Sequence, residues 1–118
     1  MGKQEKISVI VIRVGEAPKE EWIPNTLEAV QELVGGYIES VSLVLPNPFA
    51  LLVNEEGLLR SLPPNRMVRS DALGPHKNTV FVGNIVVLQT HKGEWVDMEH
   101  LDVKAAMWWI NHQLVPAE

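Results

Sequence analysis

The sequence predicts an α+β fold, in which a mixed, mainly antiparallel sheet of about five or six strands carries one short internal helix and one C-terminal helix. Two observations lead to this prediction. Short apolar runs rich in β-branched residues recur along the 118 residues and are separated by turns that contain glycine or proline. Two other segments, residues 25–34 and a segment that begins near residue 97, carry apolar residues at helical spacing. We expect residues 1–118 to form a single domain, because a chain of this length supports one hydrophobic core.

The first two strands are predicted at residues 7–14 and 20–23. Residues 7–14 are apolar at nearly every position and rich in β-branched side chains, which predicts a central strand buried on both faces. Residues 20–23 predict a shorter strand that Pro24 ends. Because residues 15–18 favour a turn, we expect the two strands to pair as a hairpin.

A helix is predicted at residues 25–34. Asn25 supplies an amide cap and Glu28 an acid three residues later, the residue types that satisfy the free N–H groups at a helix start. Apolar residues then recur at helical spacing, namely Leu27, Val30, Leu33 and Val34. Gly35 or Gly36 is expected to supply the left-handed residue that ends the helix.

The middle of the chain predicts further strands and one long loop. Residues 37–44 favour a half-exposed strand and residues 49–53 an interior one. Residues 54–57 fit a type I turn followed by a left-handed glycine, so residues 58–60 are expected to return as the second strand of a hairpin. Residues 62–75 contain three prolines and predict a long loop, a kind of segment that often carries function.

The last third of the chain predicts a strand followed by the terminal helix. Residues 79–89 form the last large strand, and Gly83 inside it indicates a bulge or a close backbone approach. Asp97 is expected to cap the helix. Trp108 and Trp109 cannot share one narrow helical stripe, because neighbours are separated by about 100°. We therefore expect one of the two at the surface, where it hints at self-association.

Composition and charge restrict the classes of partner. The chain carries 10 Lys and Arg against 15 Asp and Glu, which gives a formal net charge of −5. Because binding to phosphates requires a broad basic surface, we expect that the protein does not bind duplex nucleic acid. The sequence has no apolar run near the roughly 20 residues that cross a bilayer, so we expect no membrane partner. Absence of cysteine fits a reducing compartment, and we expect a cytoplasmic location.

Residues 58–93, here called the basic island, hold five basic side chains and one acid. Such a cluster favours a small anionic ligand. Within it, two prolines at 63–64 stiffen the chain before Asn65 and Arg66, and the planar fork of Arg66 can grip a phosphate with two hydrogen bonds. The alternative is structural: Arg66 pairs with Glu55 or Glu56 and ties the loop to the preceding hairpin.

Other polar residues are candidates to support Arg66. Arg60, Arg69 and Lys77 could add positive charge, or could be solvated surface cations. Asn54, Asn65 and Tyr37 could orient the ligand. For Tyr37 the alternative is a tyrosine at the edge of the core, directly after the helix cap.

Catalytic and metal chemistry are not predicted. The four histidines lack the close spacing of metal ligands, and no phosphate-binding glycine loop, nucleophile elbow or Ser/His/Asp set can be assembled from the sequence. We therefore expect no catalytic residue, no metal ion and no cofactor, and we expect the protein not to be an enzyme.

Four sequence motifs occur along the chain in an order and at a spacing that resemble those of a known family. They are residues 25–28 (NTLE), 33–39 (LVGGYIE), 53–57 (VNEEG) and 62–66 (LPPNR). The chain is similar over about its first two-thirds, and over residues 80–88, to a family found in phages and mobile elements and catalogued as domain of unknown function 3846. This resemblance implies a compact α+β domain and a phage or mobile-element setting, and it brings no catalytic residues.

Together these features lead us to expect a phage or mobile-element accessory protein that sequesters a small phosphorylated or nucleotide-derived ligand. The expected ligand is a host immune signal, which would make the protein a counter-defence sponge in the host cytoplasm, and a homo-oligomer could share one site between protomers. One alternative is a protein-interaction module that inhibits a host protein through an acidic surface and the C-terminal helix. Another is a weak hydrolase that acts on the same kind of nucleotide.

Overall fold

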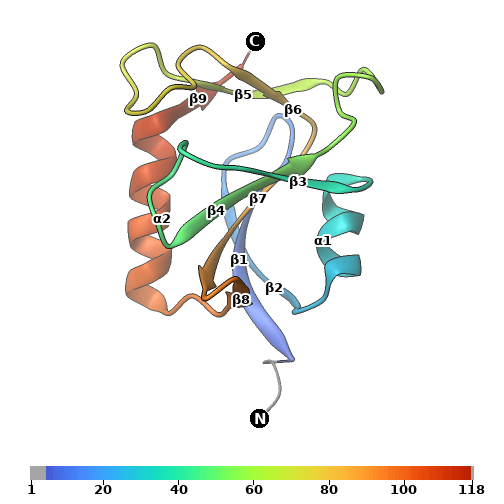
Figure 1. The fold of residues 1–118 in the computed structure, drawn as a ribbon, viewed down its shortest axis with the longest axis vertical. Coiled ribbons are helices and arrows are strands. Elements are labelled where there is room, and N and C mark those ends of the chain that lie inside the picture. Colours follow the sequence, from blue (N-terminus) through green and yellow to red (C-terminus); the bar gives the residue numbers. More distant parts are fainter. Residues whose placement is uncertain (1–4, 118) are drawn as a thin grey trace.

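The computed structural model describes residues 5–117 and shows an α+β fold with two antiparallel sheets (Figure 1). The larger sheet has six strands: β1 (Lys6–Ile12), β2 (Lys19–Pro24), β3 (Ile38–Val41), β4 (Phe49–Asn54), β7 (Ile85–His91) and β8 (Glu94–Val96). Their order is β2-β1-β7-β4-β3, with β8 paired to β7. The smaller sheet, in the order β6-β5-β9, is formed by β5 (Pro64–Val68), β6 (Val80–Val82) and β9 (Leu114–Pro116). The predicted fold class is confirmed, whereas the second sheet was not predicted.

The two helices, α1 (Leu27–Val34) and α2 (His100–Gln113), cover opposite faces of the larger sheet (Figure 1). Side chains of β1 alternate between the faces: Ile10 and Ile12 pack in the cluster of α2, and Val9 and Val11 in the cluster of α1. Burying each such side chain stabilises the fold by about 1.5–3 kcal/mol. The prediction that β1 is buried on both faces is confirmed, but β7 is the middle strand of the sheet.

The N-cap of helix α1 lies one residue later than expected. Thr26 is the N-cap, and its Oγ1 accepts a hydrogen bond from the N–H of Ala29 at 3.1 Å. Asn25 instead is buried and donates from Nδ2 to the carbonyl oxygen of Trp95 at 3.3 Å. The expectation of an Asn25 cap is therefore wrong, because that amide joins the helix start to β8. The helix ends at Gly35 in the left-handed conformation, as predicted.

Residues 58–60 do not form the expected return strand. The chain makes consecutive turns, with N–H groups of Arg60 and Leu62 donating to the carbonyl oxygens of Glu56 and Gly57 at 2.9 and 3.0 Å. The left-handed backbone falls on Ser61 (φ 54°) and not on Gly57. The strand comes later, as β5, inside the expected loop. The prediction failed because β5 pairs with strands from distant segments, which local turn patterns do not reveal.

The single strand expected at residues 79–89 is two strands that belong to different sheets. The chain passes from β6 to β7 through Gly83, whose φ of +75° is costly for other residues. A Cβ atom there would lie 2.8 Å from Cδ1 of Leu62. The predicted close approach is thus confirmed, and it marks the corner between the two sheets.

Helix α2 is capped by Glu99 and not by Asp97. The N–H of Glu99 donates to the carboxylate of Asp102 at 3.0 Å, while Oδ1 of Asp97 accepts from the N–H of Ser8 in β1 at 2.7 Å. On the helix, Trp108 is 51 % exposed and Trp109 packs against the core, so the expected division of the tryptophan pair is confirmed. Neither α1 nor α2 has the length and apolar character needed to cross a membrane.

Candidate functional site

Asn65 occupies the start of β5 and joins three parts of the fold. Its side chain is buried, and Nδ2 donates to the carbonyl oxygens of Ile12, at the end of β1, and of Gly83, both at 2.8 Å. These bonds satisfy main-chain acceptors at the junction of the two sheets. The structure thus places Asn65 in a supporting position, from which it reaches a ligand only through Arg66.

Arg66 is the one charged side chain among the buried residues of 5–117, with 7 % of its surface exposed. Its Nη1 donates to Oδ1 of Asn65 at 2.8 Å and to the carbonyl oxygen of that residue at 3.2 Å. Nη2 donates to the carbonyl oxygen of Glu16, in the β1–β2 turn, at 2.7 Å. Burial lowers the pKa of Arg66, but a guanidinium keeps its charge at neutral pH. The side chain is therefore a cation held by neutral oxygens.

Within residues 5–117, Arg66 forms no ion pair with any carboxylate. The alternative in which Arg66 pairs with Glu55 or Glu56 is therefore wrong. Those two residues lie in the turn after β4, whereas the guanidinium is turned to the β1–β2 turn. An arginine has five N–H donors. The described hydrogen bonds use three of them, which leaves two for a ligand or solvent.

A cavity of about 450 Å³ lies beside Arg66. Its volume is in the range of small-molecule sites. Helix α2 and β9 supply most of its apolar wall, Arg66 and Asn65 a polar wall, and the β1–β2 turn a third side. It is lined by Gly15, Glu16, Ala17, Pro18, Asn65, Arg66, Ile110, Asn111, Leu114, Pro116 and Ala117. This arrangement can hold a small molecule that presents an anionic group to the guanidinium.

Asn54 and Arg60, two of the expected site residues, support the end of α1 instead. Nδ2 of Asn54 donates to the carbonyl oxygen of Val34 at 3.0 Å, and Nη1 of Arg60 donates to that of Gly35 at 2.8 Å. The last carbonyls of a helix lack partners within it, so these bonds stabilise the α1 terminus. Asn54 also lines a second cavity of about 500 Å³, distinct from the one beside Arg66.

The remaining expected residues are at the surface. Arg69 forms an exposed ion pair with Asp71, with 3.0 Å between Nε and Oδ1, which raises the pKa of Arg69 and lowers the pKa of Asp71. Lys77 is exposed, and Tyr37 is 68 % exposed. Neither is among the residues that line the cavities beside Arg66 and Asn54. The expected site residues are thus distributed over the fold: Asn65 and Arg66 come together beside one cavity, and Asn54 and Arg60 come together at the end of α1.

Several residues of the Arg66 cavity were not identified from the sequence as site residues. They are the carbonyl of Glu16 and the α2–β9 residues Ile110, Asn111 and Leu114. The apolar pattern of the terminal helix predicts that Ile110 and Leu114 face inward. No local sequence pattern indicates that Ile110 and Leu114 lie near Arg66, because these residues are about 45 positions away from Arg66 in the sequence.

In the described part of the chain, no group of three or more His, Asp or Glu side chains is placed to hold a metal ion.

Comparison with known proteins assigns the chain to a family. A family model described as Domain of unknown function (DUF3846) matches residues 7–108, which includes Asn65, Arg66 and the first part of α2. Comparison with curated proteins and with solved structures gives no match. Since the family match covers most of the sequence, the chain belongs to the DUF3846 family.

Proposed function

We propose that the protein binds a small anionic ligand, without converting it chemically, in the cavity beside Arg66. The observation that supports this is the buried guanidinium without an ion pair among residues 5–117. Removing a cation from water is costly, and the carbonyl oxygens of Glu16 and Asn65 offset only part of that cost. A carboxylate or phosphate at the two unused donors would complete the site.

The lining favours a compact ligand with an aliphatic body. Ile110, Leu114 and Pro116 offer apolar contact, and the amide of Asn111 offers polar contact. None of the described lining residues is aromatic, so a nucleobase would find no ring on which to stack. A nucleotide-derived immune signal bound by a phage counter-defence protein is the narrower form of the proposal. Such a ligand would place its phosphate at Arg66 and its base outside the cavity.

Binding is favoured over catalysis because of the chemical groups available. The described lining offers one carboxylate, on Glu16, but no serine, threonine, cysteine or histidine that could act as a nucleophile or proton carrier. The weak-hydrolase alternative predicts product after long incubation with a nucleotide. The binding proposal predicts that the ligand returns intact when the protein is denatured.

Thermal unfolding with three probes, namely inorganic phosphate, glutarate and adenosine monophosphate, tests the proposal. A ligand at about 100 times its Kd stabilises the folded state by about 2.7 kcal/mol, which raises the midpoint by several degrees. We expect at least one probe to produce this rise. The rise should be lost in Arg66→Gln and kept in Arg60→Gln, which removes a guanidinium bonded to Gly35 outside the cavity.

Because Arg66→Gln also removes hydrogen bonds within the fold, a second variant blocks the cavity from its exposed side. Asn111→Phe fills space from an exposed position on α2, and Lys104→Phe adds the same ring elsewhere on the exposed surface of that helix. We expect Asn111→Phe to abolish the ligand-induced rise and Lys104→Phe to preserve it. Equal rises in all variants, or no rise with any probe, would contradict the proposal.

A second candidate function, inhibition of a host protein through the C-terminal helix, is favoured by one observation. Trp108 is half exposed and its ring stacks on that of His112, with 3.6 Å between the ring centroids. Exposed aromatic rings are frequent anchors of protein interfaces. This function predicts that a stoichiometric host partner is lost in Trp108→Ser and retained in Arg66→Gln, which is the reverse of the ligand-binding result.

A further inference from the structure

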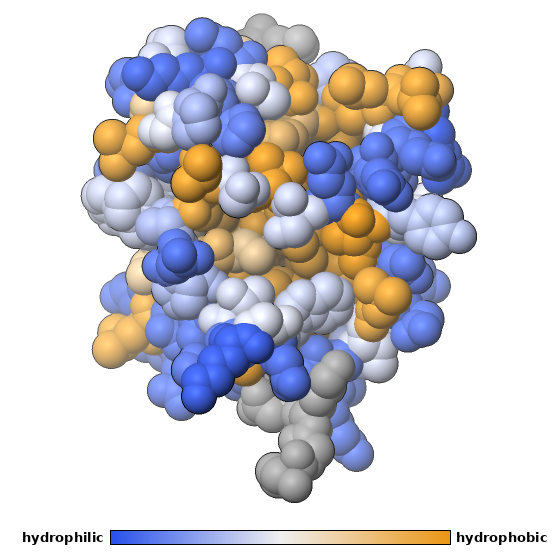
Figure 2. All heavy atoms as spheres, viewed as in Figure 1, coloured by the Kyte–Doolittle hydropathy of each residue, from blue (hydrophilic) through white to orange (hydrophobic). Residues whose placement is uncertain are grey.

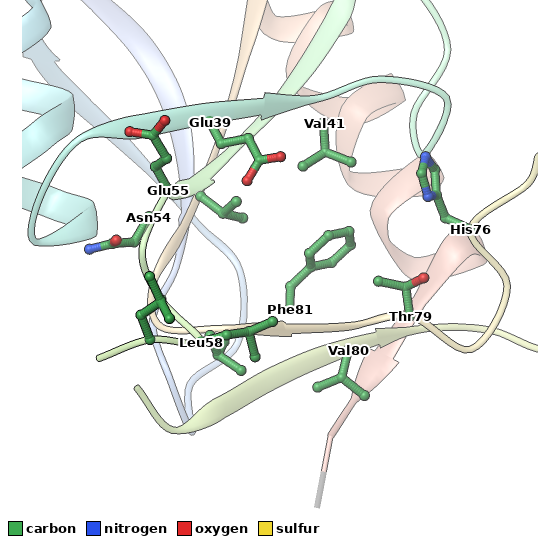
Figure 3. A pocket seen from close by; sticks show the side chains of 13 residues that line it. Glu39, Val41, Asn54, Glu55, Leu58, His76, Thr79, Val80 and Phe81 are labelled. Atoms are coloured by element: carbon green, nitrogen blue, oxygen red, sulfur yellow. The ribbon is translucent and has the colours of Figure 1, made fainter. Parts of the chain in front are cut away.

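The larger cavity, of about 500 Å³, lies between the two sheets and differs from the Arg66 cavity in character (Figure 3). Its apolar surface includes Val41 and Val53 from the larger sheet and Phe81 from the smaller one. In Figure 3 the ring of Phe81 points from β6 toward Val41 on β3. The cavity therefore offers a pocket for an apolar side chain.

Apolar side chains continue from this cavity onto the surface. Leu58, Leu59 and Val80 line it and are 79 %, 87 % and 42 % exposed. Figure 2 shows apolar surface in the middle of this face and, at the upper right, over the turn that follows β4. Leucines exposed beside an open apolar cavity are typical of a surface that a partner covers. The apolar area extends beyond the cavity itself, which favours a macromolecular partner over a small molecule.

Two acidic residues, Glu39 and Glu55, are among the residues that line the same cavity. Figure 3 shows the Glu39 carboxylate directed into the cavity below β3. In residues 5–117 neither carboxylate forms an ion pair with a lysine, arginine or histidine. Both residues are exposed, so a cation of a partner can reach them. The charge at the cavity therefore complements lysine or arginine next to the apolar anchor.

The strands on either side of the cavity are both edge strands. In the described chain β3 pairs only with β4, and β6 only with β5. An edge strand presents unpaired main-chain N–H and C=O groups, which an extended peptide can use for hydrogen bonds.

We propose that this cavity docks an extended peptide segment of a partner protein, with an apolar anchor side chain flanked by lysine or arginine. The anchor packs on Phe81, Val41 and Val53, while its basic neighbour pairs with Glu39 or Glu55. Leu58 and Val80 cover the anchor and exclude water from it. This surface is separate from the Arg66 cavity and from Trp108, so it does not depend on the function proposed above.

Selection from a random 12-residue peptide display library on the immobilised full chain tests this proposal. We expect enrichment of peptides that combine an apolar residue with adjacent lysine or arginine. Affinity of the selected peptides should fall by about threefold in the double variant Glu39→Gln/Glu55→Gln, as for loss of one ion pair at the surface. The double variant Glu32→Gln/Glu56→Gln removes the same charge from exposed positions outside the cavity and should bind normally.

The apolar contribution is tested with a second matched pair. Leu58→Ser should weaken the selected peptides, whereas Leu101→Ser, at a similarly exposed position on α2, should not. No enrichment, enrichment of acidic peptides, or equal binding to both members of each pair would overturn the proposal. So would self-association of the chain that the Glu39→Gln/Glu55→Gln variant abolishes, because the occupant would then be a second copy.

Discussion

At the scale of single residues, Asn65 and Arg66 form one hydrogen-bonded unit. Asn65 ties β1 to the junction of the sheets and accepts from Arg66, which in turn reaches the β1–β2 turn. The bonds that Arg66 makes within the fold and the anion contact that we propose for it thus involve different donors of one side chain. Three donors bond to the protein, and two have no hydrogen-bond partner among residues 5–117.

Replacing Asn65 by alanine is expected to lower the free energy of unfolding by about 2 kcal/mol or more. The change leaves the carbonyl oxygens of Ile12 and Gly83 without their buried donor, and each such loss costs about 1–3 kcal/mol. Unfolding in urea measures this decrease in the free energy of unfolding. Asn111→Ala removes the same amide from an exposed position and should change stability by less than about 0.5 kcal/mol. Equal stability of the two variants would show that the bonds of Asn65 contribute nothing.

The sequence predicted this unit only in part. Two prolines followed by Asn65 and Arg66 indicate a stiffened polar segment, and the absence of an ion pair with Glu55 or Glu56 agrees with the cavity-facing reading. The carbonyl oxygen of Glu16 is 50 residues from Arg66, and no local pattern marks a main-chain acceptor as a partner. Arg60, Arg69 and Lys77 are close to Arg66 in sequence, but turns and strand pairing direct them elsewhere.

At the scale of elements, the hairpin of β1 and β2 is held by main-chain pairing and by a side-chain ion pair. Nη1 of Arg13 donates to Oε2 of Glu21, and Nη2 donates to Oε1 at 3.1 Å. This hydrogen bonding lowers the pKa of Glu21, while the attraction of the Arg13 charge acts in the same direction. A carboxylate with a lowered pKa stabilises the fold above its ordinary pKa. That contribution is lost as the pH falls through the lowered value.

Glu21→Gln should therefore remove a small, pH-dependent part of the stability. We expect the variant to lose less than about 1 kcal/mol at neutral pH, because the pair is partly exposed. The difference from the original protein should shrink as the pH falls through the lowered pKa of Glu21, because a protonated carboxyl group no longer carries the charge that attracts Arg13. Unfolding in urea at several pH values measures this, with Glu94→Gln at an exposed position as control. A difference that grows on acidification would refute the assignment.

The loop between β5 and β6 depends on Gly74, which has a φ of +92° and packs on the main chain after β3. A Cβ atom there would lie 2.5 Å from the carbonyl oxygen of Leu43. Gly93 has a similar φ of +81°, with open space around its Cα. We expect Gly74→Ala to lower the thermal midpoint more than Gly93→Ala. Both variants place alanine in a left-handed backbone conformation, which costs about 1–2 kcal/mol, but only Gly74→Ala also creates a steric clash. Equal decreases of the thermal midpoint in the two variants would show that the loop can move to relieve the clash.

At the scale of the whole molecule, the smaller sheet positions both candidate binding regions. Its strand β5 carries Arg66 toward α2 and β9, and β6 carries Phe81 toward β3 and β4. Both helices and most strands of the larger sheet could be predicted, because β-branched runs and helical spacing are local signals. The smaller sheet could not, since its strands have only three to five residues each and come from three separate segments.

Binding of an anion by Arg66 in its cavity can be tested by nuclear magnetic resonance of the arginine Nε–H groups. Arg60, which is exposed, and Arg69, which is partly exposed, serve as internal controls, because both lie outside that cavity. On titration with inorganic phosphate, glutarate or adenosine monophosphate, we predict a saturable shift of the Arg66 signal with at least one probe, while the Arg60 and Arg69 signals change little. An unchanged Arg66 signal with all three, or equal shifts of all three arginines, would contradict the account.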